Sequence, residues 1–470
     1  MALHKPMGQA LFYALSVALA RGLAIVMVPF VTKHLSTTEY GSIELMQSLA
    51  DVATVVLGFG LVDALYRFVG DVGDEPARRR IAGAAFGLIL LLGAAAALAL
   101  QGAGGLIQRL LGPAVDPVAL RLLLGSVALD GVIQVPLAWL RLTDRASLYL
   151  AMIGLRSLLH AALIVAALDA GLGVPGVMAA GLAAAALTAL ILALQQARAT
   201  GVRFDLQMTG ILLRYGSPLV LAGLGGFVLG SFDRLLLSPV VPVSALAEYA
   251  IAAKVALIAP LLFQPFGLWW FPRRILVLSE PDGRERSART VTLGLAYLTW
   301  IGLGVSIGGP VLVTLMTPPS YHGAIRYVPW LVVAAVAQHA ADLLNVGSFA
   351  GRGTSRPAAI NLTSAGVALA AYLLLIPELG VMGAVIATVT AYVVRLVLFV
   401  IDSQRRVPLS LPWPRLALYA ALAAVADWFT PAGLGWLTGG LALGAGCLIA
   451  GVVALLLGLA PVPARFRRIA

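Results

Sequence analysis

A small set of cationic side chains falls inside long apolar stretches of this sequence, where charge is costly. They are Arg21, Arg67, Arg121, Arg156, Arg214, Arg234, Lys254, Arg326 and Arg395. A charge at the centre of a bilayer costs about 2.5–3.5 kcal/mol on insertion scales, so each residue must be paired, hydrated or functional. Guanidinium groups bind phosphate oxygens through two parallel hydrogen bonds, and lysine adds a mobile point charge. The chemistry such residues offer is neutralisation of a phosphate-bearing group inside a low-dielectric interior.

Three of these residues, Arg21, Arg156 and Lys254, fall near the middle of their apolar stretches and are our candidate substrate-binding residues. At a rise of 1.5 Å per residue, Arg21 lies about 15 Å from either end of its stretch. Asp51 and Asp130 reach comparable depths on neighbouring stretches. We therefore expect either that Arg21 and Asp51, and Arg156 and Asp130, form ion pairs between helices, or that the cations line a cavity.

Two further pairs have chemically suggestive spacing. His339 and Asp342 are three residues apart, hence on one helix face. Together with Asp130 they are candidates for proton relay, because histidine titrates near neutral pH. The competing interpretation is a hydrogen-bonded core histidine. Asp233 and Arg234 lie near a span end, and either form a structural ion pair or act as a gate. For Arg67 the spacing indicates a pair with Asp63 four residues before it.

The remaining cations, Arg121, Arg214, Arg326 and Arg395, lie toward the ends of their stretches. Long side chains in such places extend to the membrane–water interface and need no function. We expect this for all four.

The elements that position these residues are membrane-spanning helices. The chain has 470 residues, of which 60% are hydrophobic and only 11% are charged, and its mean hydropathy is +0.96. Apolar runs of about twenty residues predict an all-α polytopic membrane protein, because only helices satisfy their own backbone over such lengths in lipid. We expect about fourteen spans, near 11–31, 43–68, 81–101, 119–141, 148–168, 176–196, 211–237, 246–270, 291–316, 325–350, 358–376, 381–401, 416–430 and 438–458.

The net charge of +11 is explained mainly by orientation. Lysine and arginine gather in alternate loops, for example at 78–80, 284–289 and 465–468, whereas the opposite loops carry only Lys33 and Arg109. Positively charged loops stay in the cytoplasm. The pattern predicts that both termini are cytoplasmic and that the positive charge does not bind nucleic acid.

Several classes of site are not indicated. The single Cys447 can form no internal disulfide, the five histidines are dispersed, and no phosphate-cradling loop or nucleophile motif occurs. We expect no metal, no cofactor and no catalytic residue. A membrane glycosyltransferase, polymerase or ligase would need a sizeable extracytoplasmic loop, but the longest such connection, near 102–118, carries only Arg109 and Asp116. A purely structural scaffold would leave the buried charges unexplained.

An internal repeat suggests the domain organisation. The segment at 35–48 (LSTTEYGSIELMQS) resembles 244–257 (SALAEYAIAAKVAL), and LGVPG at 172–176 matches LGVMG at 379–383 at nearly the same separation. Parallel repeats are common in transporters and place a cavity between the halves. We expect pseudo-symmetric six-helix lobes at 1–206 and 207–410, followed by two additional helices and a basic tail at 411–470.

Four segments carry a family resemblance: PFVTKHLSTTEYGSIELMQSLADVATVVLGFGLVDALYRF (29–68), LLRYGSPLVLAGLGGFVLGSFDRLLL (212–237), AEYAIAAKVALIAPLLFQPFGLWWFPR (247–273) and SYHGAIRYVPWLVVAAV (320–336). The chain resembles the polysaccharide biosynthesis proteins, oligosaccharide flippases of the multidrug/oligosaccharidyl-lipid/polysaccharide exporter superfamily. The resemblance implies a two-lobed bundle like that of the multidrug exporters. It also implies translocation of a polyprenyl-pyrophosphate-linked oligosaccharide to the periplasmic leaflet of a bacterial inner membrane by alternating access.

Such a protein would be no enzyme. It would contact membrane lipids and a lipid-linked substrate, and would work beside a polysaccharide polymerase and a chain-length regulator in making O-antigen, exopolysaccharide or capsule. Two alternatives remain open on the same fold, a cation-coupled multidrug exporter and a flippase for lipid-linked peptidoglycan precursor.

Overall fold

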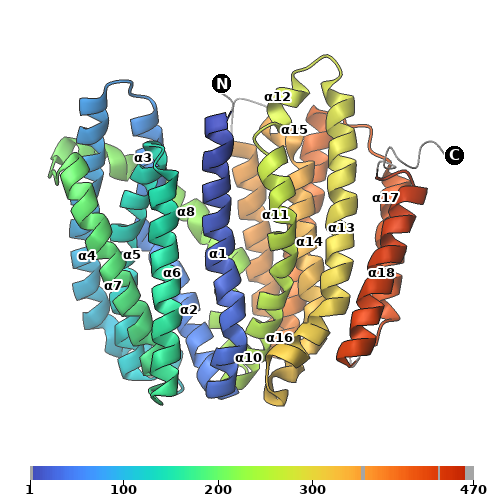
Figure 1. Cartoon of the computed structure of the whole chain (residues 1–470), viewed down its shortest axis with the longest axis horizontal. Coiled ribbons are helices and arrows are strands. Elements are labelled where there is room, and N and C mark those ends of the chain that lie inside the picture. The colour runs from blue at the N-terminus through green and yellow to red at the C-terminus, as the bar shows by residue number, and fades with distance from the viewer. Residues whose placement is uncertain (1–3, 351–354, 432–434, 461–470) are drawn as a thin grey trace. The chain divides into compact units, whose positions relative to one another are not determined.

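The computed structural model describes residues 4–350, 355–431 and 435–460, and every regular element in these ranges is a helix. The elements are α1 (His4–His34), α2 (Thr37–Gly58), α3 (Leu61–Gly70), α4 (Glu75–Leu111), α5 (Pro117–Leu142), α6 (Ala146–Asp169), α7 (Gly173–Thr200), α8 (Leu206–Gly230), α9 (Phe232–Leu237), α10 (Val243–Ala256), α11 (Ile258–Trp270), α12 (Arg274–Leu278), α13 (Gly283–Met316), η1 (Pro319–Tyr327), α14 (Val328–Leu344), α15 (Val346–Phe349), α16 (Ser355–Arg406), α17 (Trp413–Trp428) and α18 (Trp436–Leu456). Within each of the two units defined below, the long helices run side by side (Figure 1).

The predicted multi-pass, all-helical membrane protein is confirmed. In the described ranges, 12 helical segments are long and apolar enough to cross a membrane. One of them, α16, has 52 residues and is interrupted at Gly380, where the backbone is not helical, so it contains the predicted spans 358–376 and 381–401. The 16-residue α17 is shorter than a typical span but matches the predicted segment at 416–430. Counted in this way, the helices correspond to the fourteen predicted.

Aspartate and serine residues fix several helix starts. Ser36 and Glu39 form a reciprocal capping box at the start of α2, which satisfies two backbone N–H groups that have no partner within the helix. Asp74, Asp116 and Asp205 cap α4, α5 and α8 by accepting from the backbone three residues on. These caps place the helix ends, and thereby set how deep each charged residue lies.

The first of two compact units comprises Met1–Leu246. In it, α5 packs against α2, α4 and α7, α1 packs against α6, and α8 packs against α2 and α3. A core that includes Leu65, Phe86, Ile133 and Trp139 joins these helices. The backbone of α8 closely approaches the α2–α3 junction, because a Cβ added at Gly216 would overlap the carbonyl oxygen of Phe59.

The second unit comprises Ala247–Ala470. Here α14 packs against α13 and α16, and α13 also contacts α17 and α18. Tyr419 and Ala450 join the last two helices to α13 in one apolar cluster. The unit boundary follows packing and falls later than the predicted lobe boundary at 206, since α8 and α9 contact α2. The division into two repeated six-helix lobes stays a prediction.

The two matching sequence segments share one backbone feature. Gly173 begins α7 with φ +54°, and Gly380 interrupts α16 with φ +56°. Both values lie in the left-handed region, which favours glycine because it has no Cβ. Each glycine therefore makes a sharp turn between two long helices.

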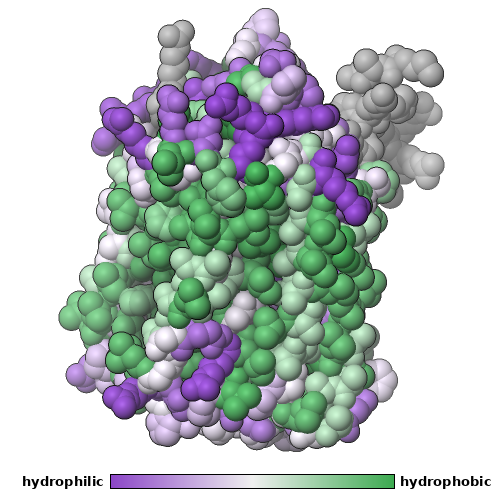
Figure 2. Space-filling view, turned by 90° about the vertical axis from the view of Figure 1, so that its left-hand side faces the viewer, coloured by the Kyte–Doolittle hydropathy of each residue, from purple (hydrophilic) through white to green (hydrophobic). Residues whose placement is uncertain are grey.

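The surface seen in Figure 2 is hydrophobic over its middle, and hydrophilic residues gather toward the two ends of the helices. Large exposed apolar side chains such as Leu98, Leu221 and Leu374 lie in the membrane-spanning helices. This is the pattern expected where lipid, rather than water, contacts the sides of a protein.

Candidate functional site

Arg21 lies in the middle of α1 and its side chain is exposed. Among the described residues, none forms a hydrogen bond or ion pair with its guanidinium group. Asp51, its expected partner, instead accepts from the Ser231 hydroxyl at 2.8 Å and from the Gln47 amide at 3.3 Å. The alternative of an Arg21–Asp51 pair is therefore wrong for this conformation.

Arg156 and Asp130 are brought together as their matching depths predicted. Both terminal nitrogens of Arg156 on α6 lie 3.4 Å from Oδ1 of Asp130 on α5. The two side chains are 33% and 16% exposed, so the pair is largely shielded. In this state the charge of Arg156 is compensated by Asp130, whereas no described residue compensates that of Arg21.

Asp233 and Arg234 lie within a buried polar cluster that also includes Glu44 of α2. Arg234 lies 3.6 Å from an oxygen of Asp233 and 3.9 Å from one of Glu44. The side chains of Asp233 and Glu44 are only 4% and 9% exposed. Together with the Asp51–Ser231 hydrogen bond, these contacts join α2 to the junction of α8 and α9. The structure thus contains the Asp233–Arg234 ion pair, while gating by these two residues stays a prediction.

His339 and Asp342 share a face of α14 but have different partners. His339 Nδ1 lies 2.9 Å from the Ala335 carbonyl oxygen, and its ring meets Phe263 edge-on. Asp342 accepts a 2.8 Å hydrogen bond from Arg395 of α16. These contacts match an inter-helix ion pair and a hydrogen-bonded histidine, and proton relay by either residue stays a prediction.

The expectation that Arg395 extends to the membrane–water interface is wrong. Instead of extending to the interface, its side chain is only 12% exposed and is held by Asp342, by the Asn361 amide oxygen at 2.9 Å and by the Gln338 carbonyl at 3.1 Å. The reason is that α14 presents acceptors at the same depth as Arg395. Arg67 is a second correction, since it pairs with Asp71 at 3.2 Å rather than with Asp63.

Lys254 and Arg326 lie in the second unit. Lys254 is half-buried on α10, and its role in substrate binding stays a prediction. Arg326 is 63% exposed, as expected near a span end, and also pairs with Glu248 at 3.3 Å. At the other end of α14 from Arg326, Arg274 donates to Asn345 Oδ1 at 2.5 Å, and burial lowers the pKa of Arg274 although the Asp342 carboxylate opposes this effect.

Sequence reasoning missed Glu44 and Ser231 as partners in the α2–α8–α9 cluster. Glu44 lies seven residues before Asp51, hence two turns along the same helix face. That spacing of two carboxylates inside a span is the signal that could have identified them.

Comparison with known proteins agrees with this fold. A family described as "Polysaccharide biosynthesis protein" matches residues 8–274. The solved structure of the lipid II flippase MurJ in an inward closed conformation is similar, with a TM-score of 0.72 and 12% identity over 94% of this chain and 98% of that chain. No curated protein sequence matches.

A multidrug resistance MATE family transporter of the MOP superfamily, in its inward-facing conformation, is also similar, with a TM-score of 0.62 and 18% identity over 82% of this chain and 94% of that chain. An outward-facing structure of a multidrug resistance MATE family transporter is similar as well, with a TM-score of 0.54 and 17% identity over 84% of this chain and 95% of that chain. The fold is therefore that of the multidrug/oligosaccharidyl-lipid/polysaccharide exporters. Because the family match covers more than half of its length, this chain belongs to the polysaccharide biosynthesis protein family, as its sequence predicted.

Proposed function

We propose that this protein is a flippase that moves a polyprenyl-pyrophosphate-linked oligosaccharide from the cytoplasmic to the periplasmic leaflet of a bacterial inner membrane. The product would serve cell-surface polysaccharide synthesis, namely O-antigen, exopolysaccharide or capsule. No covalent bond changes in this process. Alternating access between the two predicted lobes, with both termini in the cytoplasm, is the motion we expect.

The observation that carries the proposal is the uncompensated charge of Arg21. Arg156, Arg234 and Arg395 each lie beside a carboxylate. Arg21 has an exposed side chain in the middle of a span and no such partner within the described ranges. Since an isolated charge in a bilayer is costly, a hydrated path or an anionic ligand must compensate it. A pyrophosphate group suits a guanidinium because its oxygens accept paired hydrogen bonds.

We further propose that Arg156 and Lys254 bind the substrate together with Arg21. Arg156 would have to exchange Asp130 for the substrate, which the 3.4 Å contacts and partial exposure of the pair permit. Family membership supports a glycan-related substrate. A polysaccharide polymerase and a chain-length regulator are the partners expected to receive the product.

The test is translocation of a fluorescent polyprenyl-pyrophosphate-linked oligosaccharide in vesicles that contain the purified protein. Arg21→Ala should reduce the initial rate at least tenfold, and Arg21→Lys should retain part of it because the charge remains. Arg121→Ala is the matched control, since Arg121 is also exposed on a span but lies at its end. Wild-type rates for Arg21→Ala at normal yield would refute the proposal.

A second candidate substrate is lipid-linked peptidoglycan precursor. It is favoured by the similarity to the lipid II flippase over 94% of this chain. The same vesicles distinguish the two, because the precursor would then be moved faster than the oligosaccharide. Movement of a cationic drug, with neither lipid-linked substrate moved, would instead favour a multidrug exporter.

A further inference from the structure

A cavity of about 350 Å³ lies within the first unit, at the helix ends where α5, α6 and α7 meet. The last two turns of α5 contribute Trp139 and Leu140, and the last turns of α7 contribute Gln195 and Arg198. Arg145, just before α6, and Leu148, in its first turn, complete this part of the wall. This is the arginine-rich end of the unit, at the edge of the membrane-spanning segments. It is separate from Arg21, which lies at mid-span.

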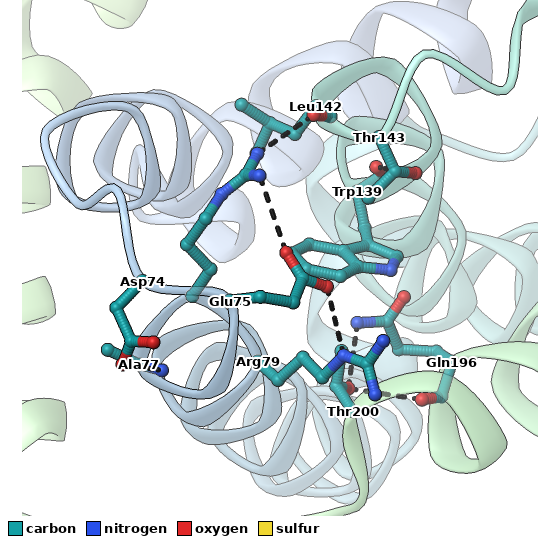
Figure 3. Close-up of polar contacts among 10 residues, drawn as sticks. Asp74, Glu75, Ala77, Arg79, Trp139, Leu142, Thr143, Gln196 and Thr200 are labelled. Carbon is teal, nitrogen blue, oxygen red and sulfur yellow. Dashed lines mark hydrogen bonds and ion pairs between the residues drawn. The ribbon is translucent and has the colours of Figure 1, made fainter.

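The charge lining this cavity is entirely positive. Arg145 and Arg198 line it, and no aspartate or glutamate does. On α4, at the same end, the arginines already have acidic partners, since Arg79 donates to Glu75 at 2.9 Å and Arg80 donates to Asp205 at 3.1 Å (Figure 3 shows the first of these). In the part of the chain that the structure describes, neither Arg145 nor Arg198 has such a partner. Both side chains are exposed and so remain able to bind an anion.

The start of α6 adds positive potential to the same place. Arg145 occupies the N-cap position, and no described side chain caps the helix there. The first N–H groups of a helix have no partner within it, and the helix dipole favours negative charge at this end. Leu148, in that first turn, lines the cavity together with Arg145. A phosphate group near Arg145 would therefore meet both a guanidinium and free backbone donors.

Two glutamines of α7, Gln195 and Gln196, also line the cavity. The Gln196 amide donates to the Thr200 hydroxyl at 3.0 Å beside Trp139 (Figure 3). These neutral amides leave Arg145 and Arg198 as the only charged groups that line the cavity.

The rest of the wall is apolar, with Leu140, Leu148 and Leu192 facing the space. Arginine side chains beside apolar walls match an amphipathic phosphate ester better than a fully hydrated ion. We infer that this cavity binds the phosphate head group of an anionic phospholipid of the arginine-rich leaflet. The site is an accessory lipid site and is independent of the proposed transport function.

The test is native mass spectrometry of the full chain in detergent with phosphatidylglycerol, phosphatidic acid and phosphatidylcholine. The wild type should retain one phosphatidylglycerol at least tenfold more tightly than phosphatidylcholine. Arg145→Gln and Arg198→Gln should each weaken retention about tenfold, because each removes a charge-assisted hydrogen bond. Arg79→Gln, at the same end but paired with Glu75, is the control and should change retention less than twofold.

If the double variant Arg145→Gln/Arg198→Gln does not fold, the two single variants and the lysine pair Arg145→Lys/Arg198→Lys carry the test. Lysines keep the charge and should restore part of the retention.

A second arm separates lipid from free phosphate. Inorganic phosphate at millimolar concentration should not displace phosphatidylglycerol, and displacement would assign the site to a soluble phosphate and overturn the lipid assignment. Equal retention by the wild type and the double variant Arg145→Gln/Arg198→Gln would overturn the site altogether.

Discussion

Arg395 donates a 2.8 Å hydrogen bond to Oδ1 of Asp342, and this contact ties the second half of α16 to α14. Arg395 also stacks over the Phe399 ring at 5.1 Å. With 12% and 31% of the two side chains exposed, neither charge is well hydrated. Each therefore depends on the other for its stability inside the second unit.

Removing one partner of this pair should be strongly destabilising. Breaking a buried ion pair costs about 3–5 kcal/mol because the remaining charge is uncompensated. We expect Asp342→Ala to reduce stability by about 3 kcal/mol and Arg395→Leu/Asp342→Leu to recover most of this loss. Thermal unfolding of the detergent-purified protein measures both. The control is Asp71→Ala. Its partner Arg67 is 58% exposed, so this substitution should lower the free energy of unfolding by less than about 1 kcal/mol. Similar melting temperatures for Asp342→Ala and Asp71→Ala would contradict the prediction.

The close approach of α8 to the α2–α3 junction should not tolerate a methyl group. Gly216→Ala would place Cβ against the Phe59 carbonyl oxygen and force the backbones apart. A cost of about 1–3 kcal/mol is expected for such overpacking. Gly210→Ala, on the same helix with nothing within 4 Å, should be neutral or stabilising by up to about 1 kcal/mol. Denaturation of the two variants side by side gives the comparison, and equal effects would refute the close contact.

Asp205 should contribute stability in a pH-dependent way. Its carboxylate accepts from the Met208 backbone N–H and from Arg80, and both interactions lower its pKa. A lowered pKa means that the stabilisation is present above the ordinary carboxyl pKa of about 4 and is lost as the pH falls below it.

The difference in melting temperature between wild type and Asp205→Asn should therefore shrink as the pH is lowered from 6 toward 3. Asparagine keeps the capping oxygen and removes only the charge. A difference that is constant over this range would show that Asp205 acts through its cap alone.

If Asp233 and Arg234 form a gate, α2 and the α8–α9 junction should separate during transport. Asp51→Cys/Ser231→Cys, made in a Cys447→Ala background, places two thiols where the side chains now touch at 2.8 Å. A short bifunctional thiol reagent should then stop translocation, while either single cysteine variant should stay active. Undiminished transport by the cross-linked protein would show that this junction is static.

Much of the fold follows from the sequence because charge and apolar length are constrained by lipid. The interruption at Gly380 separates two spans that the hydropathy pattern already distinguished. The Arg156–Asp130 pair was predictable because consecutive antiparallel spans fix relative depth. Arg395 was not, since its partner Asp342 lies on a span that is not adjacent in sequence. Depth from one helix end says nothing about which face a side chain occupies.

The same limit explains the missed cavity. Arg145 and Arg198 belong to loops whose positive charge topology already explains, so nothing in the sequence distinguishes them from Arg79 or Arg80. Only the packing of α5, α6 and α7 shows which arginines have carboxylate neighbours.

The left-handed turns at Gly173 and Gly380 affect how the protein can be handled in the laboratory. Each turn joins two long helices with almost no intervening chain, so neither offers the extended backbone that a protease must bind before it can cut. An epitope tag inserted at either glycine would have to unwind the first turn of the following helix. The connection at 201–205 is no better a place for a tag, because the backbone N–H of Arg203 donates to the Gly83 carbonyl oxygen at 3.1 Å and Asp205 caps α8.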